Sequence, residues 1–178
     1  MSNLKRNGRL RWAPSYLRNR GKVTPAQKRA LREEWPRYGI SFEHGALLDL
    51  DQPFEGQGPL LLEIGFGKGD HLIDLASRLP DHRLVGIEVH RPGIGAALLQ
   101  IRERELTNVR LIRGDARLVL TDHISGSPFA AILLQFPDPW PKPGDEHRRL
   151  LQKDFVSLLE QRLRPGGAFL LITDVASY

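Results

Sequence analysis

Three glycines follow a short apolar segment near residue 60 and can form a ligand-binding loop. The sequence EIGFGKGD places Glu63 two positions before Gly65, with Gly67 and Gly69 after it. Glycines let the backbone turn sharply and approach a ligand, and a helix that begins after them offers unpaired amides. The spacing G-x-G-x-G lacks the third glycine position of the dinucleotide fingerprint. The carboxylate of Glu63 suits a ligand with a positively charged amino-acid head better than one with a pyrophosphate.

Two further acids follow apolar segments of their own. Glu88 lies near the end of segment 83–89, where an acid accepts hydrogen bonds from a ribose diol in nucleoside-binding folds. Asp115, between Gly114 and Ala116, lies where a strand ends and a helix opens. Its carboxylate can accept a hydrogen bond from an adenine amine, but an aspartate there is equally well explained as a helix N-cap.

The most specific motif is FPDPWPK at residues 136–142. Three prolines in five positions stiffen this loop and hold Asp138 out from the strand before it. A rigid carboxylate beside an exposed aromatic residue, Trp140, and a lysine, Lys142, indicates a base-recognition site. A purely structural proline loop is the alternative, but it gives no reason for the acid or the tryptophan.

Other kinds of chemistry are excluded by residue type. The chain contains no cysteine, so disulfides, cysteine-ligated metals and thiol nucleophiles are ruled out. Neither a serine nucleophile elbow nor a P-loop is present. The six histidines are scattered without metal-ligand spacing and are expected to be packed or solvated: His44, His71, His82, His90, His123 and His147. We therefore predict no metal site, and the chemistry must come from carboxylates, histidines, hydroxyls or a bound cofactor.

The apolar segments are too short to cross a membrane. The longest runs are residues 59–64 and 130–134, and no apolar stretch follows the basic N-terminus as it would in a secretory signal. The sequence predicts a cytoplasmic protein.

Apolar runs alternate with segments of helical period from residue 59 onward. Helices are expected between the runs, with apolar faces formed by Leu72, Leu75, Ala76 and Leu79; by Ile94, Ala97, Leu98 and Ile101; by residues 115–120; and by Leu151, Phe155, Leu158 and Leu159. The strands are expected at 59–65, 83–89, 109–113, 130–136 and 168–173, the last after a turn at 164–167. This alternation predicts an α/β fold with a doubly wound, mostly parallel sheet.

The first 37 residues form a basic extension. They hold eleven lysines and arginines against two glutamates, a net charge of +9, whereas residues 38–178 carry −4. Clustered cations favour a phosphate backbone, although a solvated, disordered tail is equally compatible with the charge. A short helix is predicted at 24–35, with Thr24 as cap and Pro25 at its first position. The aromatic residues among the cations are expected to stack on bases or to anchor the arm: Trp12, Tyr16, Trp35 and Tyr38.

These motifs together resemble the bacterial tRNA (guanine-N7)-methyltransferases, class I enzymes that use S-adenosyl-L-methionine. The resemblance runs from about residue 16 to residue 178 and is carried by LLEIGFGKGD at 61–70, VGIEVH at 85–90, Gly114-Asp115-Ala116 and, above all, the 136–142 motif followed by Arg148-Arg149-Leu150. The resemblance implies a Rossmann-like methyltransferase sheet and a target guanine in the variable loop of tRNA, at position forty-six.

The resemblance also implies roles for individual residues. Glu63, Glu88, Asp115 and Asp138 would contact S-adenosylmethionine, together with the glycine loop. Asp138 would also be the acid of the catalytic site, and Lys142 and Asp174 would lie on the tRNA side.

The sequence departs from the family pattern at two places. Residues 143–146, Pro-Gly-Asp-Glu, stand where the family has a basic cluster. The family also continues past the fifth strand with a helix and two more strands, so the last strand is expected to leave an open edge. Two alternatives therefore stand beside a methyltransferase: a catalytically weak RNA-binding or partner-binding remnant of the fold, and a nicotinamide-dependent oxidoreductase, which the glycine spacing disfavours. The sequence does not indicate an oligomeric state.

Overall fold

The protein is described from a computed structural model. The described residues are 14–16, 21–43, 45–126, 128–176 and 178, together with the backbone of 4–6 and 9–11. The predictions made for Trp12 and His44 lie outside the described residues. Within the described part of the chain, no helix is both long and apolar enough to span a membrane.

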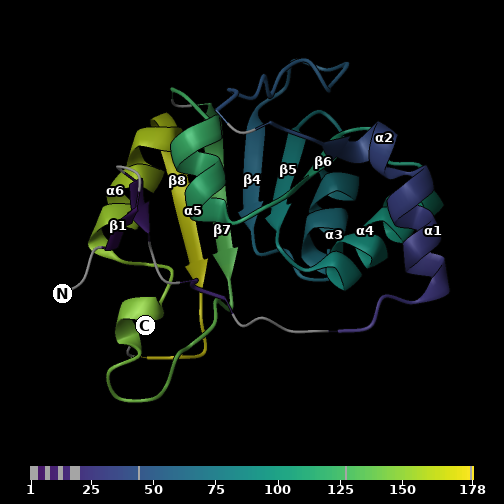
Figure 1. The fold of residues 1–178 in the computed structure, drawn as a ribbon. Helices are drawn as coiled ribbons and strands as arrows, with labels where there is room; N and C mark the ends of the chain where they lie inside the picture. The colour runs from purple at the N-terminus through teal and green to yellow at the C-terminus, as the bar shows by residue number, and fades with distance from the viewer. Residues whose placement is uncertain are drawn as a thin grey trace.

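A six-stranded parallel sheet forms the centre of the molecule (Figure 1). Its order is β3-β6-β5-β4-β7-β8, and every pairing is parallel. Parallel neighbouring strands require crossover connections, and the helices between the strands supply them. The strands are β3 (Gly39–Ile40), β4 (Leu60–Ile64), β5 (Arg83–Glu88), β6 (Val109–Arg113), β7 (Phe129–Gln135) and β8 (Leu163–Ile172).

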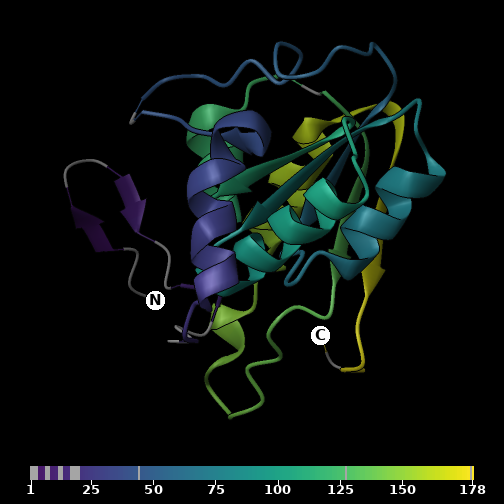
Figure 2. The same cartoon turned by 90° about the vertical axis from the view of Figure 1, so that its right-hand side faces the viewer.

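Helices cover the two faces of the sheet, which confirms the doubly wound prediction (Figures 1 and 2). One apolar core joins α1, α3 and α4 to the sheet, and the other joins α5, η1 and α6. Every residue of the central strand β4 is buried, as its aliphatic sequence predicts. The helices are α1 (Pro25–Glu33), α2 (Trp35–Tyr38), α3 (Asp70–Arg78), α4 (Arg91–Glu103), α5 (Ala116–Leu118), the π-helix η1 (Val119–His123), the 3-10 helix η2 (Glu146–Arg148) and α6 (Lys153–Arg162).

The five predicted strands are confirmed, but the structure adds to them and changes some details. Strand β3 is a sixth, and it was not predicted because two residues carry no periodicity. Strand β8 begins at Leu163, and the predicted turn at 164–167 is an irregularity inside it: Phe129 pairs with Leu163, whereas Ala131 pairs with Ala168. Leu151 precedes α6 rather than lying on its face, although it still packs against the core.

Helix α1 begins where the sequence predicts. Thr24 accepts a hydrogen bond from the backbone of Gln27, whose side chain accepts one from Thr24 N–H, which completes a capping box. The helix packs against α4: a side chain at Gly95 would clash with Gln27, and Ala30 is fully buried. The α1 helix therefore packs as part of the body of the protein, although it lies within the basic extension at residues 1–37.

The two ends of the described chain differ in their packing. Near the N-terminus, β1 (Leu4–Arg6) and β2 (Arg9–Arg11) pair as an antiparallel ribbon that the sequence did not predict. At the other end, β8 is an edge strand, as expected. Its side chains alternate, so Phe169 and Leu171 pack into the core while Leu170 and Ile172 are 48% and 38% exposed on the opposite face.

Candidate active site

A cavity of about 350 Å³ lies at the carboxyl ends of β4, β5, β6 and β7. Ligands of open parallel sheets bind at this edge. Four of the predicted site residues line it, one from the end of each strand or from the loop that follows it: Gly65, Glu88, Asp115 and Asp138. The fold therefore brings together residues spread over more than seventy positions of sequence.

The glycine loop after β4 leaves open space beside the cavity. Gly65 and Gly67 have φ values of +70° and +59°, a region that residues with a Cβ rarely adopt, and a Cβ at either would meet no atom within 4 Å. The loop is held from behind by α4, because a Cβ at Gly93 would lie 2.2 Å from the Gly67 carbonyl oxygen. The backbone is thus exposed on one side and closely packed on the other.

Glu88 supports this loop. Its Oε2 accepts a hydrogen bond from Gly67 N–H at 2.9 Å, and its Oε1 accepts from the N–H groups of Val89 and His90 at 2.7 and 2.9 Å. A carboxylate has about four acceptor positions, so these three bonds leave Oε2 able to accept from a ligand hydroxyl. Glu88 is buried and lines the cavity.

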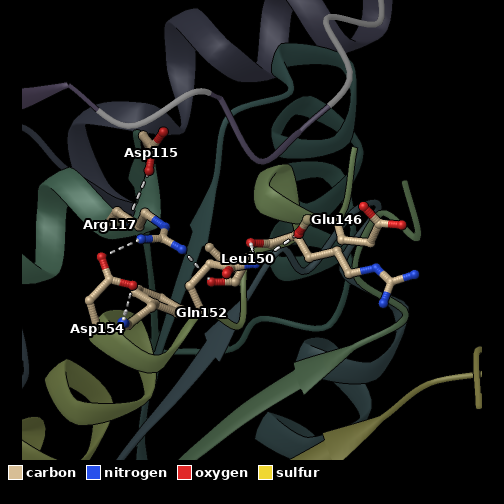
Figure 3. Close-up of polar contacts among 8 residues, drawn as sticks. Asp115, Arg117, Glu146, Leu150, Gln152 and Asp154 are labelled. Atoms are coloured by element: carbon tan, nitrogen blue, oxygen red, sulfur yellow. Dashed lines mark hydrogen bonds and ion pairs between the residues drawn. The ribbon is translucent and has the colours of Figure 1, made fainter. Parts of the chain in front are cut away.

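Asp115 caps a helix and also lines the cavity. Its Oδ1 accepts a hydrogen bond from Arg117 N–H at 2.9 Å (Figure 3). Burial raises the pKa of Asp115, while the backbone bonds from Arg117 and Leu118 oppose that rise. The N-cap interpretation is therefore confirmed, and it leaves the carboxylate in the cavity wall.

A buried arginine joins Asp115 to the far wall of the cavity. The Arg117 guanidinium donates to the Leu150 carbonyl at 2.7 Å and pairs with Asp154 at 3.2 Å (Figure 3). It also lies 4.9 Å from the centre of the Phe155 ring. Leu150 lines the cavity, so this arginine connects two walls that arise from different segments.

The aromatic residues of the 136–142 loop differ from the prediction. Trp140 is only 7% exposed; its ring lies under the Arg148 guanidinium at 3.5 Å, and its Nε1–H donates to the Ser15 carbonyl at 3.1 Å. The expectation of an exposed Trp140 was wrong, because the ring packs between two other segments. The exposed aromatic residue of the loop is Phe136, which is 62% exposed and lines the cavity.

The N-terminal segment forms part of the cavity wall. Ser15 and Tyr16 line it. The hydrogen bond from Trp140 to the Ser15 carbonyl connects this segment to a loop that lies 125 residues later in the sequence. Trp35 and Tyr38 serve as anchors: Trp35 donates to Ser41 Oγ at 3.0 Å, and Tyr38 is buried in the core. No signal in the sequence placed Ser15 at the site.

Glu63 is buried and is not among the residues that line the cavity. Its carboxylate is 4% exposed and lies 2.9 Å from His71 Nδ1. Burial raises the pKa of Glu63, and His71 opposes that rise. Gly67 and Gly69 are likewise not among the residues that line the cavity, and neither are Lys142 and Asp174, both of which are exposed.

Three histidines of the described chain have a ring nitrogen within hydrogen-bond distance of a structural partner. Besides His71, His123 Nδ1 lies 2.7 Å from the Ala46 carbonyl and His147 Nδ1 lies 2.6 Å from the Gly144 carbonyl. The described residues contain no group of three acids and histidines that could hold a metal ion.

Solved structures show that this architecture is the methyltransferase fold. The 30S ribosomal A1408 methyltransferase from an uncultured bacterium aligns with a TM-score of 0.53 at 14% identity, covering 79% of this chain and 67% of its own. The aminoglycoside resistance methyltransferase NpmB1 aligns with a TM-score of 0.53 at 18% identity, covering 68% and 58%. At these identities the likeness concerns the fold alone.

Sequence comparison is more specific. A family model described as "Putative methyltransferase" matches residues 57–178. The tRNA (guanine-N(7)-)-methyltransferase of Nitrosococcus oceani is 46% identical over 164 residues, which are 92% of this chain and 69% of that protein. The enzyme of the same name from Leifsonia xyli subsp. xyli is 46% identical over 159 residues, 89% of this chain and 70% of its own. The chain belongs to the tRNA (guanine-N(7)-)-methyltransferase family.

Proposed function

We propose that this protein transfers the methyl group of S-adenosyl-L-methionine to N7 of a guanine in tRNA, the variable-loop guanine at position forty-six. The observation that carries the proposal is the cavity at the strand ends, lined by Glu88, Asp115 and Asp138, in a chain whose relatives are named for this reaction. With tRNA as its substrate, the protein would act in the cytoplasm.

The residues present fit the proposed cofactor. The cavity volume of about 350 Å³ lies in the range of small-molecule sites, and the open surface at Gly65 and Gly67 gives a ligand access to the backbone. Glu88 has an acceptor position left for the ribose diol, and Asp115 would accept from the adenine amine. When bound, S-adenosylmethionine supplies an electrophilic methyl group on a sulfonium. Glu63, two positions before Gly65, is proposed to bind its amino-acid end.

The chain's own contribution to the reaction is positioning and electrostatics. Guanine N7 carries an exposed lone pair, so the attack needs no general base, only a base held in line with the methyl group. Positive charge develops on the purine as the methyl arrives. We assign to Asp138 the role of holding the base and favouring that charge, because the carboxylate lines the cavity on a proline-stiffened loop.

The basic extension is proposed to bind the phosphate backbone of tRNA. Residues 1–37 carry the net charge of +9, and the segment at Ser15 and Tyr16 reaches the cavity wall. We therefore assign the cations to the arm at residues 1–37 and the methyltransferase domain to residues 38–178, with Ser15 and Tyr16 of the arm adding to the cavity wall. The exposed Lys142 and Asp174 are proposed to contact tRNA outside the cavity.

The test is methyl transfer from labelled S-adenosylmethionine to unmodified bulk tRNA, with chemical mapping of N7-methylguanine. We expect the label at the variable-loop guanine. Asp138→Ala is expected to bind the cofactor but lose most turnover, whereas Asp145→Asn, an acid of the same loop outside the cavity wall, is expected to retain it.

Three outcomes contradict parts of the proposal. Cofactor binding without transfer would favour the binding remnant over the enzyme. Binding of a nicotinamide cofactor in place of S-adenosylmethionine would favour an oxidoreductase. Near-normal turnover in Asp138→Ala would remove the role given to that carboxylate.

A further inference from the structure

Phe136 is far more exposed than the apolar residues of the strand that it follows. It directly follows β7, whose apolar residues Ile132, Leu133 and Leu134 are at most 7% exposed, yet its own side chain is 62% exposed. Its φ of +44° lies in the left-handed region that bulky residues rarely adopt. An exposed aromatic ring held in a costly backbone conformation is not explained by packing.

The backbone around this residue is fixed. Phe136 N–H donates to the Ile172 carbonyl at 2.8 Å, which continues the pairing of β7 with β8 to the strand end. Pro137 follows directly and restricts the chain on the other side. Strained residues persist where the surrounding structure determines them, and they concentrate at ligand sites. The backbone thus fixes the position of an exposed residue in the wall of the cavity.

Phe136 lines the cavity close in sequence to Asp138, the residue to which we assign the role of holding the base. Phe136 and Asp138 line the same cavity and are separated by a single proline. Trp140, the other aromatic side chain of the loop, is buried under Arg148 and has its indole N–H bonded to Ser15. Of the two aromatic residues, Phe136 is the one with a free face.

We propose that Phe136 stacks on the target guanine and fixes its plane in the cavity. This inference rests on the proposed function and adds the residue that orients the base. Stacking uses the π-face of the purine and leaves its edges free, so N7 stays available for the methyl group while Asp138 contacts the base. Phe136 is then a specificity-determining residue for a purine, and its role requires an aromatic ring rather than apolar surface alone.

The experiment compares Phe136→Ala, Phe136→Leu and Phe136→Tyr in single-turnover methyl transfer to tRNA at saturating cofactor. Removal of an aromatic side chain that stacks on a base lowers the affinity by about 5- to 150-fold. We expect a loss in this range of kcat/KM for tRNA in the alanine variant, a loss nearly as large with leucine, and recovery to within about 3-fold with tyrosine. Leu47→Ala is the matched control, because Leu47 is 64% exposed and lies outside the cavity.

Two binding measurements separate this role from others. The Kd of S-adenosylhomocysteine, measured by calorimetry, is expected to stay within about 2-fold of wild type in all variants. A parallel loss of cofactor affinity and turnover would make Phe136 a wall of the cofactor site and overturn the proposal. Wild-type activity in the leucine variant would overturn it as well, because apolar surface would then suffice.

A tRNA with 2-aminopurine in place of the variable-loop guanine tests the stack without catalysis. Stacking on Phe136 predicts fluorescence quenching on binding that is lost in the alanine variant and restored by tyrosine. If the wild-type chain methylates no guanine, the proposed function fails, but this quenching still supports or refutes the stack. Equal quenching in wild type and Phe136→Ala would refute it.

Discussion

Replacing Arg117 by methionine tests whether one buried side chain holds two walls of the cavity together. The Arg117 side chain is 5% exposed; its guanidinium donates to the Leu150 carbonyl at 2.7 Å and pairs with Asp154 at 3.2 Å. Methionine keeps an unbranched stem against Phe155 and removes both polar contacts. The variant therefore isolates the guanidinium from the packing of the chain that carries it.

The expected cost follows from these contacts. A hydrogen bond from a charged donor to a buried carbonyl contributes about 1.5–3 kcal/mol. The Leu150 carbonyl keeps a bond from Gln152 N–H at 3.0 Å, so it is not left without a donor and the cost stays near the lower end. The ion pair adds at most about 1 kcal/mol, because the Asp154 side chain is 52% exposed. We expect Arg117→Met to lower the free energy of unfolding by about 1.5–2.5 kcal/mol.

Urea unfolding measures this change, with Asp154→Asn as the matched variant that removes only the partner acid. The slope m should be unchanged, and a loss of about 1.5–2.5 kcal/mol corresponds to a fall in Tm of about 3–10 °C for a domain of this size. Asp154→Asn should cost less than about 1 kcal/mol. An Arg117→Met variant within about 0.5 kcal/mol of wild type would refute the reasoning. Equal costs in the two variants would show that the ion pair, not the carbonyl bond, stabilises this region.

Two further predictions concern charge. Burial raises the pKa of Glu63 above its ordinary value of 4.5, so its contribution to stability is full below that value and is lost as pH rises through the folded-state pKa. Glu63→Gln has no carboxyl proton to lose, so the variant keeps its stability as the pH rises. Urea titrations should therefore show the unfolding free energy of Glu63→Gln rising relative to wild type across that pH window. A difference that stays flat or falls would contradict the raised pKa of Glu63. Deleting residues 1–13 removes four cations and should reduce the slope of log affinity for tRNA against log salt by up to about 3 to 4. An unchanged slope would mean that the arm does not contact phosphates.

The alternation of apolar runs with helical periods was enough to predict the fold. A strand buried on both faces needs a continuous aliphatic run, as in β4, and a helix between two such runs makes the crossover parallel. The cap at Thr24 was predicted for the same kind of reason, because its partners lie within three residues. Strand β3 escaped prediction because a two-residue strand exists only through its pairing with β6.

The strand-end acids were also predictable, since in a parallel sheet the ends of successive strands meet at one edge. Asp115 and Glu88 were placed by this argument, and the structure sets both in the cavity wall. The position of a residue along its strand does not determine the direction in which its side chain packs. Glu63 follows the same rule, yet it does not line the cavity, and its carboxylate contacts His71.

What the sequence determined by itself were the local and periodic features: the buried strands, the helix cap and the stiff loop at residues 136–142. Only the tertiary structure decided which aromatic side chain of that loop is exposed, because Trp140 is buried by Arg148 and by a bond to Ser15, contacts that come from distant segments. It likewise decided that Arg117 joins Asp115 to Leu150. Contacts between segments far apart depend on how whole elements pack, and local residue patterns do not encode that packing.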